Sequence, residues 1–339
     1  MNIKSKPRKK LTLKDIAKLI SVTPATVSKA LRDSDDISAE MKEKVKKIAK
    51  EMGYRPNILA RSLISNKSRI LGVLIPDLRI SFFSEAVRGM YEEASRKGYE
   101  TILMVHDESR DKEKQKLEFL SDINVDGILL NATGGKGNYP LYNDLAEEGI
   151  KFVCWDRKLE DLPFKSVTID DKKASYELTT KIINAGRSNI LFLGPNTGIP
   201  VAKNRFEGYK LALKEHGIPF KSSLVVQTFR NFNDSYKKMC SLLKKRIKID
   251  GVVSVGGLIT YGAGKAILDN NYSIPEDVVL GEFGDNDIVS RLGVPFYTVN
   301  QNPYKIGKAS VDLLIKIIES KEKEDSLHNI IIESEIIKR

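Results

Sequence analysis

A run of hydroxyl-bearing and basic side chains between residues 23 and 32 has the composition of a surface that contacts DNA. Lys29 and Arg32 can donate hydrogen bonds to guanine edges or phosphates, and the hydroxyl groups suit phosphate oxygens. Pro24 and Ala25 have no side-chain donor, so we expect them to contact thymine methyl groups, which leaves the DNA sequence unspecified. The candidate contacts are Thr23, Pro24, Ala25, Thr26, Ser28, Lys29 and Arg32. The alternative interpretation is that the basic residues of a small helical unit form only a solvated face.

Two short helices joined by a tight turn are needed to position these side chains. Residues 11–31 have apolar positions at helical spacing, and Thr23-Pro24 places a hydroxyl N-cap and a proline at the start of the second helix. A third helix is predicted over residues 39–52, and Gly53 ends it. The sequence therefore predicts an all-α helix-turn-helix head whose second helix enters a major groove.

The positive charge of the chain is concentrated in its first fifth. The 339 residues carry 56 Lys and Arg against 45 Asp and Glu, a net charge of +11. Residues 1–69 hold 18 basic and 7 acidic residues, so the remaining residues are balanced. A basic unit on a neutral body is typical of a nucleic-acid-binding module joined to a second functional part.

Four segments over residues 13–77 together carry a resemblance to a known family. They read LKDIAKLISVTPATVSKAL, ISAEMKEKVKKIAKEMGYRPN, LARSL and ILGVLIPDL. These segments resemble the head and hinge of the LacI (lactose repressor)/GalR-type family of bacterial transcriptional regulators. The resemblance implies a recognition helix in the major groove and, from each subunit of a homodimer, a hinge helix in the minor groove.

The resemblance also implies roles for residues in the hinge, which we expect over residues 55–69. The family's wedge leucine, which inserts between central base pairs, corresponds to Leu63, its hinge alanine to Ala60 and its asparagine to Asn57. An apolar wedge that kinks the duplex is a known minor-groove device. We expect Tyr54, which precedes the hinge, to contact DNA as well. The alternative is that Leu63 only packs between the head and the body.

From residue 70 onwards, short apolar strands alternate with amphipathic helices, which predicts parallel sheets covered by helices. An internal repeat indicates two similar lobes, because SRILGV at Ser68 recurs as SNILFL at Ser188. The family implies an α/β two-lobed core like that of periplasmic binding proteins, with Rossmann-like lobes. The head is then expected over residues 1–54 and the core over residues 70–339.

The chain of such a core crosses between its lobes more than once. We expect the first lobe at about residues 70–167 and 298–327, and the second at about 168–297 and 328–339. The last predicted strand, over residues 330–337, would belong to the second lobe. A ligand would bind between the lobes, at the carboxyl ends of their strands.

Side chains near the ends of these strands are the candidates for binding an effector. The resemblance implies that Arg205, in NRFEGY, binds effector hydroxyl or carboxylate groups and that Phe82 stacks on a sugar ring. The other candidates are Arg79, Asn131, Arg157 and Asp285. Each also has a purely structural interpretation, such as a core contact, a loop cap or an inter-lobe ion pair.

The second lobe departs from the family pattern at two places. The family's Asn-Asp pair before a helix becomes Gly256-Gly257, and its Gly-Phe-Asp-Asp run becomes Glu-Phe-Gly-Asp at residues 282–285. Two acidic contacts to sugar hydroxyls are therefore missing, while Arg79, Arg157 and Arg205 are expected nearby. This departure favours an anionic effector such as a sugar phosphate.

The sequence also lacks the features of several other classes of protein. Its two cysteines are too few for a disulfide framework or a Cys-based metal site, and its three histidines are far apart. Gly262-Ala-Gly264-Lys265 lacks the upstream glycine and the Ser or Thr of a phosphate loop. Neither a secretory signal nor an apolar run long enough to span a bilayer is evident, so we expect a cytoplasmic protein. We expect no catalytic activity, cofactor or metal.

The predicted function is that of a sequence-specific transcriptional regulator, a repressor, whose operator affinity is controlled by a sugar or sugar phosphate. Its expected partners are pseudo-palindromic double-stranded operator DNA, the effector and a second copy of the chain. A solute-binding protein of transport type would need an export signal and would leave the basic head unexplained. A nucleotide-using α/β enzyme would need a phosphate motif.

Overall fold

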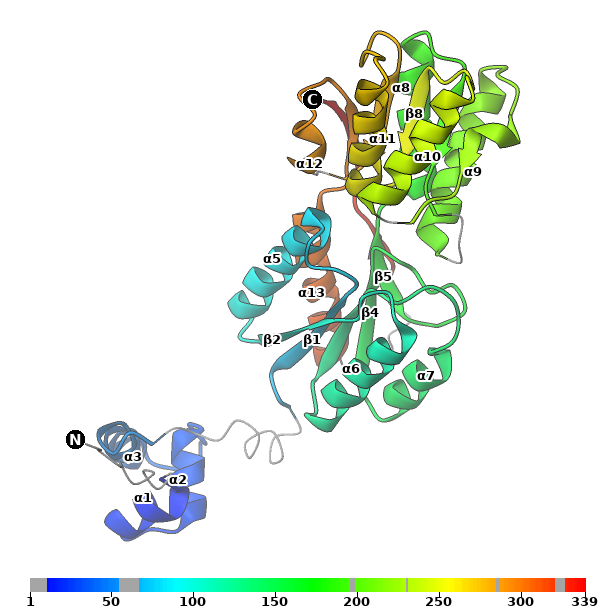
Figure 1. Cartoon of the computed structure of the whole chain (residues 1–339). Helices are drawn as coiled ribbons and strands as arrows, with labels where there is room; N and C mark the ends of the chain where they lie inside the picture. The colour runs from blue at the N-terminus through cyan, green and yellow to red at the C-terminus, as the bar shows by residue number, and fades with distance from the viewer. Residues whose placement is uncertain (1–10, 55–66, 196–198, 230, 285–286, 321–326) are drawn as a thin grey trace, which may run out of the picture. The chain divides into compact units, whose positions relative to one another are not determined.

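The computed structural model separates the chain into two compact units, Met1–Ser68 and Arg69–Arg339 (Figure 1). The structure describes residues 11–54, 67–195, 199–229, 231–284, 287–320 and 327–339. The predicted hinge residues Asn57, Ala60 and Leu63 and the predicted effector residue Asp285 lie outside the described residues.

The N-terminal unit contains three short helices packed around one small core. They are α1 (Leu13–Leu19), α2 (Pro24–Leu31) and α3 (Ala39–Glu51). Hydroxyl side chains cap two of them, because Thr23 Oγ1 accepts from Thr26 N at 3.1 Å and Ser38 Oγ accepts from Met41 N at 3.3 Å. The fully buried core residues are Ile16, Val27, Ala30 and Val45.

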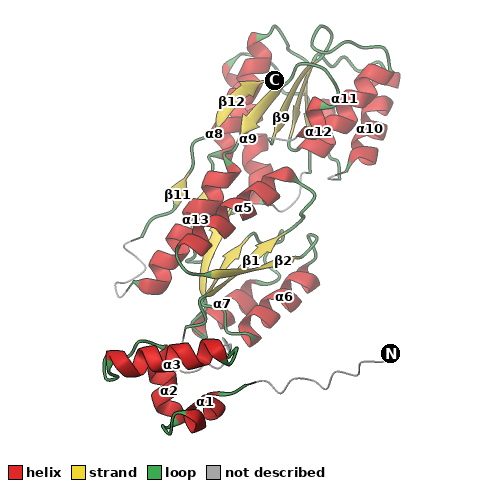
Figure 2. Cartoon of the chain, turned by 90° about the vertical axis from the view of Figure 1, so that its left-hand side faces the viewer, coloured by secondary structure: helices red, strands yellow, loops and turns green. Residues whose placement is uncertain are grey.

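A six-stranded parallel sheet forms the centre of the first lobe, in the order β11-β5-β4-β3-β1-β2. Its strands are β1 (Ile70–Ile75), β2 (Glu100–Val105), β3 (Gly127–Leu130), β4 (Lys151–Trp155), β5 (Lys165–Thr168) and β11 (Ile330–Ile331). Its helices are α5 (Ser81–Arg96), α6 (Arg110–Asp122), α7 (Tyr139–Glu147) and α13 (Pro303–Glu319). Helices α5 and α13 lie side by side on one face and α6 and α7 cover the other (Figure 2). Because both faces are covered, the central strands are almost continuously apolar.

The second lobe repeats this arrangement, with the strand order β12-β10-β9-β8-β6-β7. Its strands are β6 (Ile190–Leu193), β7 (Val225–Val226), β8 (Gly251–Ser254), β9 (Val279–Phe283), β10 (Tyr297–Asn300) and β12 (Glu335–Lys338), the last antiparallel to β10. Its helices are α8 (Asp171–Asn184), α9 (Pro200–Glu215), α10 (Phe232–Lys244), α11 (Gly257–Asp269), the short α12 (Asp287–Ser290) and the 3-10 turn η1 (Ser222–Leu224). Helices α8 and α9 cover one face of the sheet, and α10 and α11 cover the other.

The chain crosses between the two sheets three times. Residues 169–170 join β5 to α8, residues 301–302 join β10 to α13, and residues 332–334 join β11 to β12. Each lobe is therefore assembled from separate stretches of sequence, and three short segments connect the lobes.

These crossings correct two expected lobe limits. Strand β10 lies in the second sheet, so the chain returns to the first lobe at residues 301–302 and not at 298. The strand expected over residues 330–337 is two strands, of which β11 completes the first sheet and only β12 belongs to the second. An apolar run rich in isoleucine predicts a strand, but it does not predict which sheet edge the strand completes.

Candidate functional site

Helix α2 presents one exposed face of the N-terminal unit. Its opposite face carries Val27 and Ala30 into the core. Of the predicted DNA contacts, Thr23, Pro24, Ala25, Lys29 and Arg32 are exposed and Thr26 and Ser28 are half-buried. Because Ala25, Lys29 and Arg32 recur at helical spacing, they share one side of the helix. The sequence-predicted residues therefore form a single surface.

Two of these side chains are held within the unit itself. Lys29 forms an ion pair with Asp36, and Arg32 Nε donates to the Ser28 carbonyl at 3.2 Å. Both cations are exposed, so these contacts leave them close to solvent and able to reach a phosphate. Tyr54 is half-buried and packs against the helical core, and burial raises the pKa of its hydroxyl.

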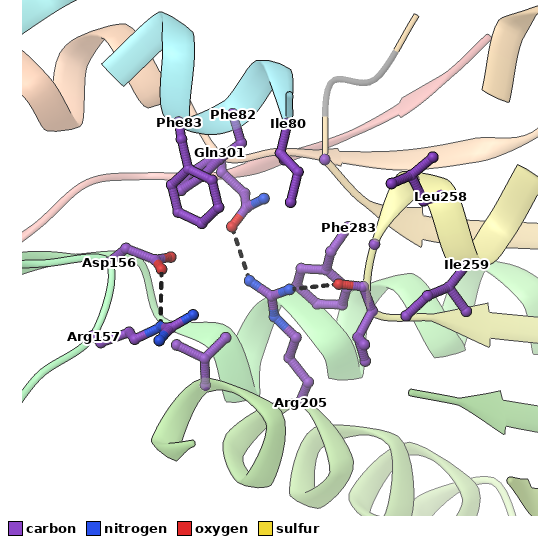
Figure 3. Close-up of a pocket in the computed structure, with 15 residues that line it drawn as sticks. Ile80, Phe82, Phe83, Asp156, Arg157, Arg205, Leu258, Ile259, Phe283 and Gln301 are labelled. Atoms are coloured by element: carbon purple, nitrogen blue, oxygen red, sulfur yellow. Dashed lines mark hydrogen bonds and ion pairs between the residues drawn. The ribbon is translucent and has the colours of Figure 1, made fainter. Parts of the chain in front are cut away.

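A cavity of about 80 Å³, here called the aromatic compartment, is lined by residues of both lobes (Figure 3). The first lobe contributes Ile80, Phe82, Phe83, Asp156 and Arg157. The second lobe contributes Val201 and Arg205 from α9, residues 255–259 around the start of α11, and residues 283–284, while Gln301 comes from a crossover. The lining residues follow strands at their carboxyl ends, where parallel α/β sheets bind ligands.

The aromatic wall of this compartment is fixed by Trp155, the last residue of β4. The Phe82 ring stacks on the Trp155 ring with centroids 6.4 Å apart, and the Phe83 ring meets it edge-on at 5.9 Å. Trp155 is fully buried, whereas Phe82 retains 7% exposure. Phe82 therefore offers an apolar ring surface at the cavity.

A carboxylate lies beside this wall. Asp156 lines the compartment, and Asn131 Nδ2 donates to Asp156 Oδ2 at 3.0 Å and to the Trp155 carbonyl at 3.3 Å. Asn131 is fully buried and is not one of the described residues that line the compartment. The predicted effector residue Asn131 thus orients Asp156, a residue that can accept hydrogen bonds from ligand hydroxyl groups.

Arg157 is buried and already paired. Its Nη1 donates to Glu108 Oε2 at 3.0 Å and to the Ala132 carbonyl at 2.7 Å, and its Nη2 donates to Glu108 Oε1 at 2.5 Å. Burial acts to lower the pKa of Arg157, but the hydrogen-bonded Glu108 carboxylate and the other negative groups around it raise the pKa overall, so the guanidinium stays charged. Arg157 therefore lines the compartment as part of an ion pair.

Arg205 extends from α9 into the compartment (Figure 3). Its Nε donates to Asp171 Oδ1 at 2.7 Å, Nη1 donates to the Val255 carbonyl at 3.1 Å and Nη2 donates to Gln301 Oε1 at 2.9 Å. The guanidinium also lies 3.9 Å from the centroid of the Phe283 ring, in a cation–π contact. All three nitrogen atoms are thus engaged, and the planar group has a fixed orientation.

Asp171, the carboxylate partner of Arg205, has a raised pKa. Burial raises the pKa of Asp171 to about 6, although the Arg205 guanidinium acts in the opposite direction. The nearby carboxylates of Asp156 and Asp170 contribute to the increase.

The start of α11 supplies backbone donors. Gly256 is the N-cap and provides no side-chain cap, and a Cβ atom added there would meet no atom within 4 Å. The first N–H groups of a helix lack intrahelical acceptors, so those of Gly257 and Leu258, which line the compartment, suit ligand oxygens. The glycines noted as departures from the family pattern therefore open this wall.

The three arginines that were expected to favour an anionic effector all form ion pairs. Arg79, which is highly exposed, bonds Asp77 at 2.7 Å and is not one of the described lining residues of the compartment. Arg157 holds Glu108 and Arg205 holds Asp171. Each arginine invoked for an anion already faces a carboxylate, so the site carries no excess of positive charge from these groups.

A second cavity of about 360 Å³, here called the polar compartment, shares Arg157 with the first. Its first-lobe wall is formed by residues 132–136, Tyr139 and residues 159–161. Its second-lobe wall is formed by residues 199–200, Lys203 and Asn204, at the start of α9. None of these wall residues was predicted from the sequence as a ligand contact.

Several lining residues of the aromatic compartment were also missed. Val255, Leu258 and Ile259 have no polar side chain that could have singled them out. Gln301 follows directly after β10, and its position at the carboxyl end of a strand is a signal that could have identified it.

A helix-turn-helix unit joined to a two-lobed core with a cavity between the lobes defines a class of protein, the ligand-responsive DNA-binding regulators. The model of bacterial regulatory proteins of the lacI family matches residues 12–57, and the model of the periplasmic binding protein domain matches residues 71–322. The chain belongs to the lacI family of regulators, and the predicted family, fold class and regulatory function are confirmed.

Relatives match over nearly the whole chain. The HTH-type transcriptional regulator RegA of Clostridium saccharobutylicum is 33% identical over 97% of this chain and 98% of its own length. The ribose operon repressor of Halalkalibacterium halodurans is 31% identical over 91% of both chains. A solved structure of the lac repressor dimer bound to operator and the anti-inducer ONPF has a TM-score of 0.85 at 20% identity, over 98% of each chain. A CelR–cellobiose complex has a TM-score of 0.73 at 23% identity, over 96% of this chain and 98% of its own.

No helix in the described part of the chain is long and apolar enough to cross a membrane. Within the same residues, no group of three His, Cys, Asp or Glu side chains is placed to hold a metal ion.

Proposed function

We propose that an effector binds in the aromatic compartment and controls operator binding through Arg205. The observation that supports this proposal is the position of two of the three hydrogen-bond acceptors of Arg205. Asp171 follows directly after the crossover at residues 169–170, and Gln301 lies within the crossover at residues 301–302. A ligand that bonds the Arg205 guanidinium acts on the same side chain that holds two of the three connections between the lobes.

The coupling follows from differential affinity. An effector that makes better contacts in one arrangement of the lobes stabilises that arrangement, and operator DNA does the same through the hinges of the dimer. The two binding free energies are then reciprocal. The sign of the effect, release from DNA or recruitment to it, follows from which arrangement the effector prefers.

We infer that the effector is a sugar or a sugar phosphate. The Phe82 ring provides an apolar surface for a sugar ring, Asp156 accepts from hydroxyl groups, and Arg205 and the amides at the start of α11 donate to oxygens. The paired state of the arginines favours a neutral sugar within this class.

On the DNA side, we propose a homodimer on a pseudo-palindromic operator. Helix α2 of each head lies in the major groove, with Thr23, Pro24, Ala25, Thr26, Ser28, Lys29 and Arg32 towards the DNA and Tyr54 near the hinge. Asn57, Ala60 and Leu63 of the hinge, within residues 55–69, enter the minor groove. The protein acts as a repressor rather than an enzyme, in the cytoplasm and on the nucleoid when bound to its operator.

The experiment uses the full chain and a duplex selected from random sequences. A thermal-shift screen against sugars and sugar phosphates identifies a ligand, and fluorescence anisotropy then measures operator affinity with and without that ligand. Arg205→Ala should retain specific DNA binding and lose the response to the ligand, while the exposed Arg291→Ala should respond like the parent protein. An undiminished response in Arg205→Ala contradicts the proposal.

A further inference from the structure

A cavity of about 210 Å³, here called the amino-end cavity, lies in the second lobe at the edge of the sheet opposite to the effector site. Val279 and Tyr297, which line it, are the first residues of the parallel strands β9 and β10, whereas the effector site lies at the carboxyl ends of the strands. Its described lining residues belong neither to the aromatic compartment nor to the polar compartment. A ligand held here would therefore be separate from the inter-lobe effector.

Arg187 brings a cation to this cavity, and part of its guanidinium is unused. Its Nη2 donates to the Pro275 and Glu276 carbonyls, each at 2.8 Å, which fixes the planar group against the loop before β9. Its Nε is shielded from solvent and has no hydrogen-bond partner among the described residues. A shielded donor without an acceptor is unfavourable, because it has given up water without a replacement. An oxygen atom of a bound anion would supply the acceptor.

Lys338 adds a second cation from β12. It lies directly opposite Tyr297 in the antiparallel pair of β10 and β12, and its Nζ is 6.0 Å from the centroid of the Tyr297 ring. Glu276, which is exposed, is the one acidic residue among the described lining residues. Two cations against one carboxylate leave an excess of positive charge, unlike the ion-paired arginines of the effector site. The charge favours an anionic ligand.

Flat apolar groups form much of the remaining wall. Phe296 is 3% exposed, and its backbone N–H and carbonyl both pair with Arg339, at 3.0 and 2.9 Å. Tyr297 is half-buried, and Pro275 and Pro295 add two rigid rings. Walls made of rings that the backbone holds in place suit a flat, apolar ligand body.

The volume of the amino-end cavity suits a ligand with one ring. An apolar cavity of about 150 Å³ admits benzene, whereas sites for drug-sized ligands measure about 300–1,000 Å³. At about 210 Å³, the cavity has room for one aromatic ring and a carboxylate. The positive charge and the flat walls then favour an aromatic acid over a sugar.

Two strands that line the cavity lead directly to crossovers between the lobes. Strand β10, which begins at Tyr297, runs into the crossover at residues 301–302, and β12, which carries Lys338, follows the crossover at residues 332–334. Each strand is only four residues long. A ligand with different affinities for two positions of these strands would therefore change the balance between arrangements of the lobes.

We propose that the amino-end cavity binds a small aromatic carboxylate as a second effector. The acid group bonds Arg187 and Lys338, and the ring lies against Phe296 and Tyr297. The regulatory part rests on the proposed function, because it uses the same coupling between lobe arrangement and operator binding. The binding site itself is independent of the inter-lobe effector.

The binding test is calorimetry on the full chain at low salt with benzoate, 4-hydroxybenzoate and phenylacetate. Benzamide, which keeps the ring without the charge, and acetate, which keeps the charge without the ring, are the comparisons. At least one aromatic carboxylate should bind one-to-one with a Kd below about 1 mM and about fivefold more tightly than either comparison, because charge-assisted hydrogen bonds and ring contacts both contribute.

Variants of the two cations locate the ligand. Arg187→Gln and Lys338→Gln should each weaken binding about fivefold or more. Lys214→Gln, at an exposed lysine that does not line the cavity, is the matched control. Lys338 is exposed, so Lys338→Gln keeps the test valid if loss of the Arg187 hydrogen bonds destabilises the fold.

The regulatory test is fluorescence anisotropy with operator DNA. A saturating concentration of the aromatic carboxylate should change operator affinity about fivefold in the parent protein and in Lys214→Gln. The same concentration should change it less than about twofold in Lys338→Gln, because the ligand is no longer held.

The outcomes separate this proposal from the inter-lobe effector site. The amino-end site is wrong if none of the three carboxylates binds, if benzamide binds equally well, or if Arg187→Gln and Lys338→Gln both bind normally. Loss of carboxylate binding in a folded Arg205→Ala protein also overturns it, because the ligand then lies between the lobes. If an effector from the sugar screen changes operator affinity and the aromatic carboxylate does not, the second effector is wrong and the proposed function stands. If neither ligand changes operator affinity, both proposals fail.

Discussion

The guanidinium of Arg205 donates a hydrogen bond to the carboxylate of Asp171 inside the second lobe, across 2.7 Å, with both side chains at least 93% buried. Neither group can be solvated by bulk water, so each depends on the other and on the Val255 and Gln301 acceptors around them. This dependence makes the pair the most sensitive point of the effector site.

Removal of one partner should destabilise the core strongly. Arg205→Ala leaves the Asp171 carboxylate buried without its cation, which typically costs roughly 3–5 kcal/mol of unfolding free energy. Urea denaturation followed by circular dichroism measures the change. The double variant Arg205→Met with Asp171→Asn should recover part of the loss, because no buried charge remains uncompensated. An Arg205→Ala protein as stable as the exposed control Arg291→Ala would contradict the pairing.

Effector affinity should depend on pH because of Asp171. Its pKa in the folded protein is raised to about 6, so the group becomes protonated as the pH falls through 6. A neutral carboxyl orients the Arg205 guanidinium less firmly, so effector binding should weaken below this pH. Calorimetry between pH 5 and pH 8 checks this, and Asp171→Asn should remove the transition.

The same shift has the opposite sign for stability. A carboxyl whose folded pKa lies above its unfolded value near 3.8 favours the folded state most at low pH, and this contribution is lost as the pH rises through 6. The unfolding free energy of Asp171→Asn, relative to that of the parent, should therefore be more favourable at pH 7 than at pH 4. Equal differences at both pH values would show that the acidity of Asp171 is unperturbed.

The salt dependence of operator affinity should show that Lys29 contacts a phosphate. Lys29→Ala should weaken binding to all duplexes by a similar factor and lower the slope of log affinity against log salt by about 0.9. Anisotropy titrations at several salt concentrations measure the slope. Lys214→Ala, an exposed lysine of the core, should leave it unchanged. Loss of affinity for only one sequence would instead assign Lys29 to a base.

The predicted hinge wedge gives a separate test. Leu63→Ala should abolish specific operator binding while the core still binds its effector, because the apolar side chain that unstacks a base step is gone. Gel shifts and calorimetry on the same preparation measure the two activities. Leu78→Ala, an exposed leucine of the core, is the control. Unchanged operator affinity in Leu63→Ala would refute the assignment of the wedge.

A glycine in α11 should be required for packing. A Cβ atom on Gly262 would lie 2.1 Å from Ser235 Oγ and 2.6 Å from the Phe232 carbonyl. Gly262→Ala should therefore be destabilising by about 1–3 kcal/mol from overpacking, in spite of the gain of about 1 kcal/mol in helix propensity. Thermal unfolding measures the result, and Ser241→Ala on the exposed face of α10 should have little effect. A stabilised Gly262→Ala protein would show that the two helices can move apart.

The glycines of α11 also show why this helix could not be predicted with ease from the sequence. Helix α11 is difficult to predict from helix propensity, because Gly257, Gly262 and Gly264 each lower the predicted helicity. Gly262 packs closely against α10, Gly264 packs closely against Leu292 and Leu280, and Gly257 lines the cavity. None of these contacts is visible before the tertiary structure is known. The GAGK segment, which superficially resembled a phosphate loop, lies within this helix.

The residues of the site that could be predicted are those that follow the carboxyl end of a strand or match a family segment. Phe82, Arg157 and Arg205 were identified because they follow strands or match a family segment, and they line the cavity. Asn131 and Arg79 follow strands as well, but hydrogen bonds direct one to Asp156 and the other to Asp77. Side-chain partners of this kind depend on distances between segments that are far apart in the sequence.

The three crossovers affect how the core can be dissected. Because β11 and β12 complete opposite sheets from one short C-terminal stretch, deletion of residues 327–339 removes an edge strand from both lobes at once. No single cut in the gene yields either lobe as a continuous fragment. Circular permutation does not change this, because the two lobes still alternate along a permuted chain.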